Sequence, residues 1–311
     1  MSVKVGGSGV LAVNKGAGAT SFDVVALVRR RLRVHRVGHA GTLDPAATGV
    51  LPVLIGEATK LTPYLVDQDK EYVATVRFGL TTDTLDVEGR ALSEVTVSRL
   101  ERRDLEEASR PFVGRIKQIP PMYSAVHHEG RRLYELARQG VEVDREPREV
   151  VVHSIAVEEV ASPRATIRVV CGKGTYVRVL AADLGATLGY GGAVECLVRC
   201  RVGPFRLADA IPWADVVSAE PAVLWSRVTP PESALAGWRG VTLDERAVVA
   251  FVHGQAVEVR APEPGEGGSS VRVHDVTGTL IGVGAITEDG RQVKPVRILH
   301  ADRPGTRILP A

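Results

Sequence analysis

The residue best placed to do chemistry is Asp44, which lies in a glycine-punctuated segment spanning residues 38–49. Pro45 pushes Asp44 toward extended backbone, and the glycines of the segment allow tight bends and close approach by another backbone or a ligand. No second acid lies within twelve residues on either side of Asp44. A lone Asp in a rigid loop indicates a nucleophile or a side chain that caps its own turn, rather than half of a carboxylate pair.

An arginine-rich stretch, residues 29–36, leads into this segment. We expect a helix that begins near Thr20 or Ser21 and carries Arg29, Arg33 and Arg36 as a stripe on its solvent side. Residues 1–60 contain eight basic and three acidic residues, whereas the formal charge of the whole chain is only +2. This local excess favours a polyanion delivered to the carboxylate over a plain solvated face.

The elements that must position Asp44 alternate between strand and helix over roughly the first 210 residues. Strands are expected at 10–14, 71–78, 150–160 and 165–171, and helices at 98–110 and 175–188. Residues 117–150 are proline-rich and then very polar, which indicates an excursion from the core. Residues 212–238 look linker-like and helical, and residues 240–311 are typical of a compact β-barrel module.

Composition excludes several classes of protein. With 311 residues, 44% hydrophobic and 24% charged, the chain has ample material for a core and fits one large domain with a small one, or two medium ones. Its three cysteines form no disulfide framework or zinc motif, and we expect buried reduced thiols. The chain has no apolar run of membrane length, and Met1 to Gly9 shows no signal-peptide pattern, so we expect a cytoplasmic protein without membrane contact.

Motifs for bound cofactors are incomplete. Gly172, Lys173 and Thr175 sit between a strand and a helix, but Ile167 stands where a phosphate-binding loop needs glycine. The acids near Gly89 have the wrong spacing for a calcium loop. We therefore expect no metal and no cofactor.

Three further residues join Asp44 in a coherent set: Tyr72 opening a strand, and Tyr176 with Arg178 at a helix start. Singly, each is better read as a core aromatic or a surface arginine. With the sequence around them, the chain resembles the bacterial tRNA pseudouridine synthases of the TruB family over residues 10–210, and more weakly over the tail. The matching motifs are Asn14-Lys15 with Thr20-Ser21-Phe22-Asp23, Arg36 to Pro52 around Asp44, Asp69-Lys70-Glu71-Tyr72, Thr81 to Asp86, Gln118 to Ala125, Gly172 to Arg178 and Leu197 to Phe205.

The resemblance implies an α+β pseudouridine synthase fold, with a central mixed, largely antiparallel sheet flanked by helices. It implies a catalytic domain over 1–230 with an RNA-gripping insertion at about 117–150, and a PUA-like RNA-binding β-barrel over 239–311. The implied reaction is isomerisation of uridine 55 in the TΨC loop of tRNA to pseudouridine. This reaction breaks the N1–C1′ bond and forms a C–C bond with no redox change, so it needs a nucleophile and a dry pocket.

The resemblance also implies roles for individual residues. Asp44 is the nucleophile, Arg178 orients it, and Tyr72 stacks on the target base; attack at C6 of uracil and attack at C1′ both stay open. His39 fills the position that the flipped base vacates in the RNA. The remaining residues implied to bind the substrate are Tyr176, Leu197 and Lys15. Those implied to contact the RNA backbone are Arg29, Arg33, Arg36 and Arg138.

The implied partner is the TΨC stem-loop of tRNA, bound by a monomer without an obligatory protein partner. Two other hypotheses remain: an RNA-binding or RNA-folding protein in which catalysis is secondary, and a guide-RNA-dependent synthase inside a protein complex, like the archaeal relatives of the family. The insertion favours the stand-alone enzyme. Gly16 and His127 depart from the family pattern, which usually has proline and lysine there, and this concerns the grip on RNA rather than the chemistry.

Overall fold

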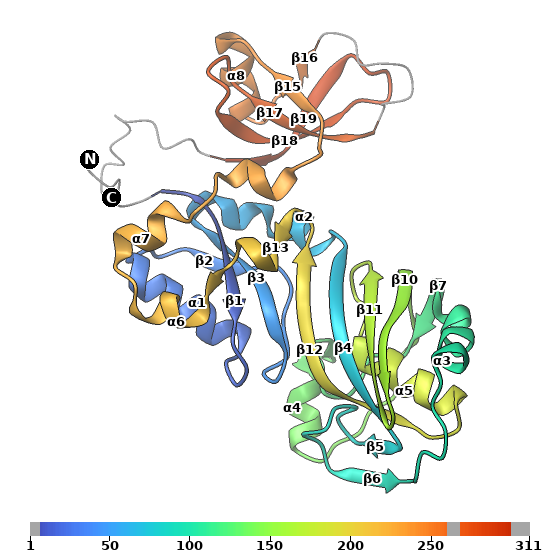
Figure 1. Cartoon of the computed structure of the whole chain (residues 1–311). Coiled ribbons are helices and arrows are strands. Elements are labelled where there is room, and N and C mark those ends of the chain that lie inside the picture. Colours follow the sequence, from blue (N-terminus) through green and yellow to red (C-terminus); the bar gives the residue numbers. More distant parts are fainter. Residues whose placement is uncertain (1–6, 260–267, 300–311) are drawn as a thin grey trace.

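The structure is a computed structural model that describes residues 7–259 and 268–299. A curved ten-stranded sheet forms its centre, in the order β14-β1-β3-β12-β4-β11-β10-β7, with β2 and β13 paired to β3 and β12 (Figure 1). The strands of this sheet are β1 (Gly9–Lys15), β2 (Val37–His39), β3 (Thr48–Ile55), β4 (Lys70–Phe78), β7 (Gly114–Gln118), β10 (Arg148–Ala161), β11 (Arg164–Cys171), β12 (Gly192–Val202), β13 (Phe205–Arg206) and β14 (Ile211–Pro212).

The sheet is mixed and largely antiparallel, as expected, because among its pairs only β1 with β14 and β3 with β12 run parallel. Strand β4 alternates along its length, and Ala74, Val76 and Phe78 point into the core. Helices and short 3₁₀ turns cover the sheet: α1 (Ser21–Leu32), η1 (Gly56–Leu61), α2 (Thr62–Val66), α3 (Arg102–Ser109), η2 (Arg110–Phe112), α5 (Val177–Thr187), η3 (Leu207–Asp209), α6 (Trp213–Ser218), α7 (Pro221–Ser226) and η4 (Pro231–Leu235).

Helix α1 begins where the sequence predicts. The Thr20 hydroxyl accepts a hydrogen bond from the Asp23 amide, and the Asp23 carboxylate accepts one from the Thr20 amide, which completes a capping box. Val25, Val28 and Leu32 are buried, as their spacing predicts. The helix ends at Leu32, and Arg33 adopts a left-handed conformation. The expected stripe is therefore broken: Arg29 lies on the helix, Arg33 caps it, and Arg36 lies beyond it.

The excursion from the sheet runs from residue 119 to residue 147, so the ends of the expected segment 117–150 belong to β7 and β10. It contains a small hairpin, β8 (His127–His128) with β9 (Arg131–Arg132), followed by α4 (Leu133–Arg138). A second hairpin, β5 (Leu80–Thr82) with β6 (Ala91–Glu94), projects from the same end of the sheet (Figure 1).

The tail forms a separate five-stranded sheet, consistent with a PUA-like module. It consists of β15 (Gly240–Thr242), β16 (Val257–Glu258), β17 (Ser270–His274), β18 (Leu280–Ile286) and β19 (Gln292–Ile298), with α8 (Glu245–Val252) packed against it. The end of the expected module, residues 300–311, and part of the start of the chain, residues 1–6, lie outside the described residues. No helix in the described part of the chain has the length and apolar character needed to cross a membrane.

Several sequence-based expectations were wrong in detail. The helix expected at 98–110 spans only Arg102–Ser109, and Pro111 lies inside a 3₁₀ turn that follows it. The linker-like region is packed rather than loose, because Val216 and Leu224 are fully buried in the core that contains α1. Of the cysteines, Cys171 is buried but Cys196 is exposed. Strand β15 and helix α8 were not expected.

Candidate active site

The loop that carries Asp44 connects β2 to β3 and is held by its own backbone groups. The Ser21 hydroxyl, at the start of α1, accepts a hydrogen bond from the Leu43 amide (2.9 Å) and donates one to the Leu43 carbonyl (3.2 Å). The Asp44 carbonyl accepts a hydrogen bond from the Ala47 amide (3.1 Å). Asp44 is thus fixed from both sides, and its side chain is left for other contacts.

Two buried cations fasten this loop to the sheet. The Arg199 guanidinium, 1% exposed, donates to the carbonyls of Val50, Thr42 and Gly41 at 2.9, 3.3 and 3.1 Å. The Lys15 ammonium, fully buried, donates to the carbonyls of Gly16, Ala19 and Pro45. The backbone is therefore gripped just before and just after Asp44.

Gly49 lies at the end of this loop for a steric reason. Its φ is +111°, and a Cβ atom there would lie 2.3 Å from the Arg199 carbonyl oxygen, because β3 passes directly beside β12. This is the close backbone approach that the glycine-punctuated motif predicts.

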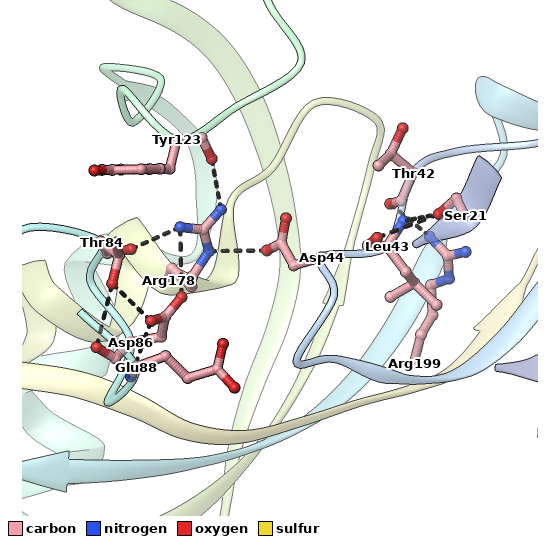
Figure 2. Close-up of polar contacts among 10 residues, drawn as sticks. All are labelled: Ser21, Thr42, Leu43, Asp44, Thr84, Asp86, Glu88, Tyr123, Arg178 and Arg199. Atoms are coloured by element: carbon pink, nitrogen blue, oxygen red, sulfur yellow. Dashed lines mark hydrogen bonds and ion pairs between the residues drawn. The ribbon is translucent and has the colours of Figure 1, made fainter. Parts of the chain in front are cut away.

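The Asp44 carboxylate pairs with Arg178 at the start of α5. The Arg178 Nε donates to Asp44 Oδ2 at 2.8 Å, and the other guanidinium nitrogens donate to the carbonyls of Thr84 (2.6 Å) and Tyr123 (2.8 Å) (Figure 2). Arg178 is 5% exposed, whereas the Asp44 side chain is 38% exposed. Among the described residues nothing hydrogen-bonds to Oδ1, and Figure 2 shows this oxygen pointing away from the guanidinium. One carboxylate oxygen is held while the other is presented.

A second carboxylate, Asp86, lies behind Arg178. Its Oδ2 is 3.7 Å from the Arg178 Nη1, and its Oδ1 accepts a hydrogen bond from the Thr84 hydroxyl at 2.6 Å. The Thr82 hydroxyl donates to the Asp86 carbonyl, which fixes the same turn. Arg178 is thus shared between two acids, one of which is turned toward the cavity.

Five of the predicted residues line one cavity of about 240 Å³. This volume is slightly below the range of roughly 300–1,000 Å³ typical of small-molecule pockets, and so suits a single nucleotide rather than a strand. Burial raises the pKa values of Tyr72 and Tyr176, so both phenols stay neutral at ordinary pH. The lining includes Asp44, Tyr72, Tyr176, Arg178 and Leu197, together with Lys70, Ser124 and Arg199.

The insertion is tied to this cavity at two points. The Gln118 side chain accepts a hydrogen bond from the Tyr176 amide and donates one to the Tyr176 carbonyl. The Tyr123 carbonyl accepts from Arg178. The excursion therefore begins at the wall of the cavity and contributes Ser124 and Ala125 to its lining.

Other predicted residues lie outside the cavity lining. Lys15 faces the backbone of the loop, with its pKa lowered to about 8 by burial. His39 lies on β2, where burial and the nearby Arg199 lower its pKa, and its buried Nδ1 has no hydrogen-bond partner among the described residues. Neither residue is among those that line the cavity.

The predicted RNA-backbone arginines are dispersed. Arg29 and Arg33 are exposed near the end of α1, whereas Arg36 pairs with Glu57 at 2.8 Å. Arg138 lies on α4, exposed, with its guanidinium 5.5 Å from the centre of the Tyr134 ring.

No role in the site was predicted for Asp86, Lys70 or Arg199, although each lies in a motif that resembles the family's. Asp86 and Arg199 contact residues that are distant in the sequence. The sequence signal for a role in the site is therefore only their position near Thr84 and Leu197 in the matching motifs. No group of three or more His, Cys, Asp or Glu in the described part of the chain could hold a metal ion.

Comparison with known proteins identifies the family of this chain. Residues 29–177 match the family model described as "TruB family pseudouridylate synthase (N terminal domain)", and residues 240–299 match "Pseudouridine synthase II TruB, C-terminal". The chain is 42% identical over 300 residues to tRNA pseudouridine synthase B of Saccharophagus degradans, covering 94% of this chain and 96% of the relative. The chain belongs to the TruB family of pseudouridylate synthases.

Other TruB relatives agree. The tRNA pseudouridine synthase B of Pseudomonas aeruginosa is 44% identical over 298 residues, covering 94% of this chain and 96% of the relative. That of Symbiobacterium thermophilum is 48% identical over 255 residues, covering 81% and 84%. Among solved structures, a chain of the "Cbf5-Nop10-Gar1 Complex" is similar with a TM-score of 0.73 and 26% identity, covering 94% of this chain and 84% of that one. The expected pseudouridine synthase fold is confirmed.

Proposed function

We propose that this chain converts uridine 55 in the TΨC loop of tRNA to pseudouridine, with Asp44 as the nucleophile. Its relatives are named tRNA pseudouridine synthase B, which supports tRNA as the substrate. The observation that carries the proposal is the Asp44 carboxylate, fixed at one oxygen by Arg178 and open at the other, at the wall of a cavity sized for one nucleotide.

The chemistry needs these residues and no electron donor or acceptor. The N1–C1′ bond breaks, the uracil turns, and C5 bonds to C1′. C5 then loses its proton, and the bond that the Asp44 oxygen had formed is broken, which restores the carboxylate. The Asp44 oxygen attacks either C6 of the uracil or C1′ as the base departs. Arg178 orients the carboxylate, Tyr72 stacks on the base, and Tyr176 with Leu197 closes the cavity against water.

The target base must leave its stacked position in the folded loop to enter the cavity. His39 then occupies the vacated place in the RNA, and Lys15 holds the Asp44 loop in position through the Pro45 carbonyl. Arg29, Arg33, Arg36 and Arg138 contact phosphates, and the excursion at 119–147 grips the RNA arm. The C-terminal module, residues 239–311, adds a second RNA contact to the catalytic domain, residues 1–230, and the chain acts as a monomer without an obligatory protein partner.

The decisive experiment incubates the purified chain with an unmodified tRNA transcript and maps pseudouridine along it. We expect one new pseudouridine, at position 55, and none in a transcript with cytidine there. A chain that modifies only in the presence of a guide RNA or added proteins would contradict the stand-alone enzyme, and modification at another position would contradict the site.

The nucleophile is tested by Asp44→Asn. This variant should lose turnover while its affinity for tRNA stays within a few-fold, because one carboxylate contributes little to phosphate binding. Measurable multiple turnover by the variant would remove Asp44 from the role. A variant that keeps every biological effect without turnover would favour an RNA-folding protein instead.

A further inference from the structure

Lys70 is a buried cation in the wall of the cavity that the proposed mechanism leaves without a task. Lys70 is 6% exposed. It lies on the same face of β4 as Tyr72, which comes two residues later in the strand. Both side chains line the cavity that contains Asp44. Burying a charge is costly unless it is paired. The described residues nevertheless offer Lys70 no carboxylate within ion-pair distance.

The hydrogen bonds of Lys70 are also incomplete. An ammonium group has three N–H donors. Those of Lys15 all find carbonyl acceptors, whereas the Lys70 ammonium donates only to the carbonyls of Val66 and Gln68 among the described residues. One donor of Lys70 is left over in a group that borders the cavity.

The charged and titratable groups around Lys70 do not neutralise it. Arg199 approaches from β12 and Cys171 from β11, while Asp67 and Asp69 lie in the turn before β4. Those two acids are engaged elsewhere: Asp67 accepts from Lys173, and Asp69 interacts with His153, both at 2.9 Å. Burial lowers the pKa of Lys70 to about 8, so the group is still a cation at pH 7. With Arg199 beside it, this wall of the cavity is positive.

We propose that Lys70 is a catalytic residue that donates its remaining N–H to a carbonyl oxygen of the flipped uracil and stabilises the negative charge that develops on that ring. This inference rests on the proposed function. In attack at C1′, an Asp44 oxygen bonds to C1′ while the N1–C1′ electron pair stays on the uracil. In attack at C6, the oxygen bonds to C6 while the C5=C6 pair moves onto the O4 enolate. Both routes place a negative charge on uracil oxygens without moving a proton.

A purely structural role makes a different prediction. Lys70 fastens two carbonyls at the end of α2, so its loss could simply loosen that turn. Such damage would affect every substrate alike and would lower stability. Stabilisation of a charged ring instead depends on how easily the ring itself carries the charge. 5-Fluorouracil is more acidic than uracil and therefore depends less on a cation beside it.

The test measures single-turnover consumption of the target nucleoside at saturating enzyme, with tRNA that carries uridine or 5-fluorouridine at position 55. The enzymes are the parent, Lys70→Met, Lys70→Arg and Lys60→Met. Lys60 is the matched control, because its ammonium also binds a backbone carbonyl, that of Ile298 at 2.8 Å, but lies outside the cavity lining. Consumption is the readout because C5 of 5-fluorouridine carries fluorine in place of the proton that is lost when pseudouridine forms.

Loss of one donor to a developing oxyanion typically slows a reaction by roughly 10²–10³-fold. We expect Lys70→Met to show such a loss on uridine, at least ten-fold less loss on 5-fluorouridine, and affinity for tRNA within a few-fold of the parent. Lys70→Arg should recover part of the rate, and Lys60→Met should react like the parent on both substrates.

An equal loss of Lys70→Met on the two substrates, or a loss that tracks a lowered melting temperature, would overturn the proposal. If Lys70→Met does not fold, Lys70→Gln removes the charge alone, because its amide still donates hydrogen bonds, and it should likewise lose more rate on uridine than on 5-fluorouridine. A parent enzyme that leaves uridine 55 unchanged would refute the proposed function itself, and is thereby distinguished from failure of Lys70 alone.

Discussion

At the scale of single residues, the site is organised by cations that grip backbone carbonyls. Arg199 contacts three carbonyls of the Asp44 loop and its edge, yet no carboxylate of the described residues pairs with it. It also pairs across the strands with Tyr72, next to an irregularity in the β12–β4 register where one extra residue sits on β12. Such bulges re-aim side chains near active sites. Arg199 therefore acts on Asp44 through the loop.

Replacing Arg199 with lysine should expose this positioning role. A single ammonium cannot reproduce the fork that reaches Val50, Thr42 and Gly41 together. We expect kcat to fall about 10²-fold, the scale associated with a displacement of about 1 Å, with little change in the Kd for tRNA. Arg201→Lys is the control, since Arg201 contacts Glu71 and Gly203 instead. Comparable losses in both variants would show a general effect of β12 rather than positioning of Asp44.

The proposed place of His39 in the RNA leads to a prediction about pH. Because burial lowers the pKa of His39 from 6.5, the neutral ring is the major form in the folded enzyme at pH 6.5 and above. His39→Phe, which can still stack, should therefore keep more of the single-turnover rate than His39→Ala, and both should follow the parent's pH profile between 6.5 and 8. The expected stability effect has a definite sign: as the pH falls through 6.5 the unfolded chain takes up the proton first, so stability is lost.

Pre-steady-state rates across pH for the parent and the two variants provide the measurement. If His39 were a general base, both variants would lose a limb of the profile. If it only braced its loop, both would melt earlier than the parent, with no rescue by phenylalanine.

At the scale of elements, local signals predicted β1, β4, β10, β11 and α1, because alternation in β4 and helical spacing in α1 reflect which faces are buried. They did not predict β3 and β12, which lie in the middle of the sheet. The start of α1 followed from the capping residues Thr20 and Asp23. The end of α1 did not follow from the sequence. The residue that adopts the left-handed conformation there is Arg33, not the glycine that commonly marks the end of a helix. The contacts of Asp86 and Arg199 were beyond reach for a different reason: they join segments brought together only by the sheet and the turn after β5.

The close pairing of β3 with β12 at Gly49 gives a stability prediction. Gly49→Ala would combine a positive φ of +111° with a Cβ that meets backbone, which cannot give way as a flexible side chain does. We expect a loss of about 3 kcal/mol or more in the free energy of unfolding, measured in urea. Gly18→Ala is the matched control, since its φ is +83° but its Cβ would lie in open space, and it should cost only about 1–2 kcal/mol. Similar losses would mean that β3 and β12 can separate at little cost.

At the scale of the whole molecule, the C-terminal sheet is joined to the catalytic sheet by a shared core. Leu280 and Val283 of β18 lie in one buried cluster with Leu61, Leu65 and Leu235. The sequence indicated a separate module but not this contact, because the apolar residues on either side also have local partners. The two sheets are therefore packed against each other through buried apolar side chains.

The salt dependence of tRNA binding tests whether the end of α1 contacts the RNA. Arg29 and Arg33 are exposed there, whereas Arg103 and Arg110 are exposed on and after α3, at the opposite end of the sheet (Figure 1). Removing one arginine that neutralises a phosphate should reduce the slope of log K against log salt by about 0.7–0.9. The variant Arg29→Gln with Arg33→Gln should therefore lower the magnitude of the slope for tRNA binding by about 1.4–1.8. The variant Arg103→Gln with Arg110→Gln removes the same formal charge and should leave the slope within error of the parent's. A similar drop in both would indicate a diffuse field rather than direct phosphate binding, and no drop in the first would place the RNA away from α1.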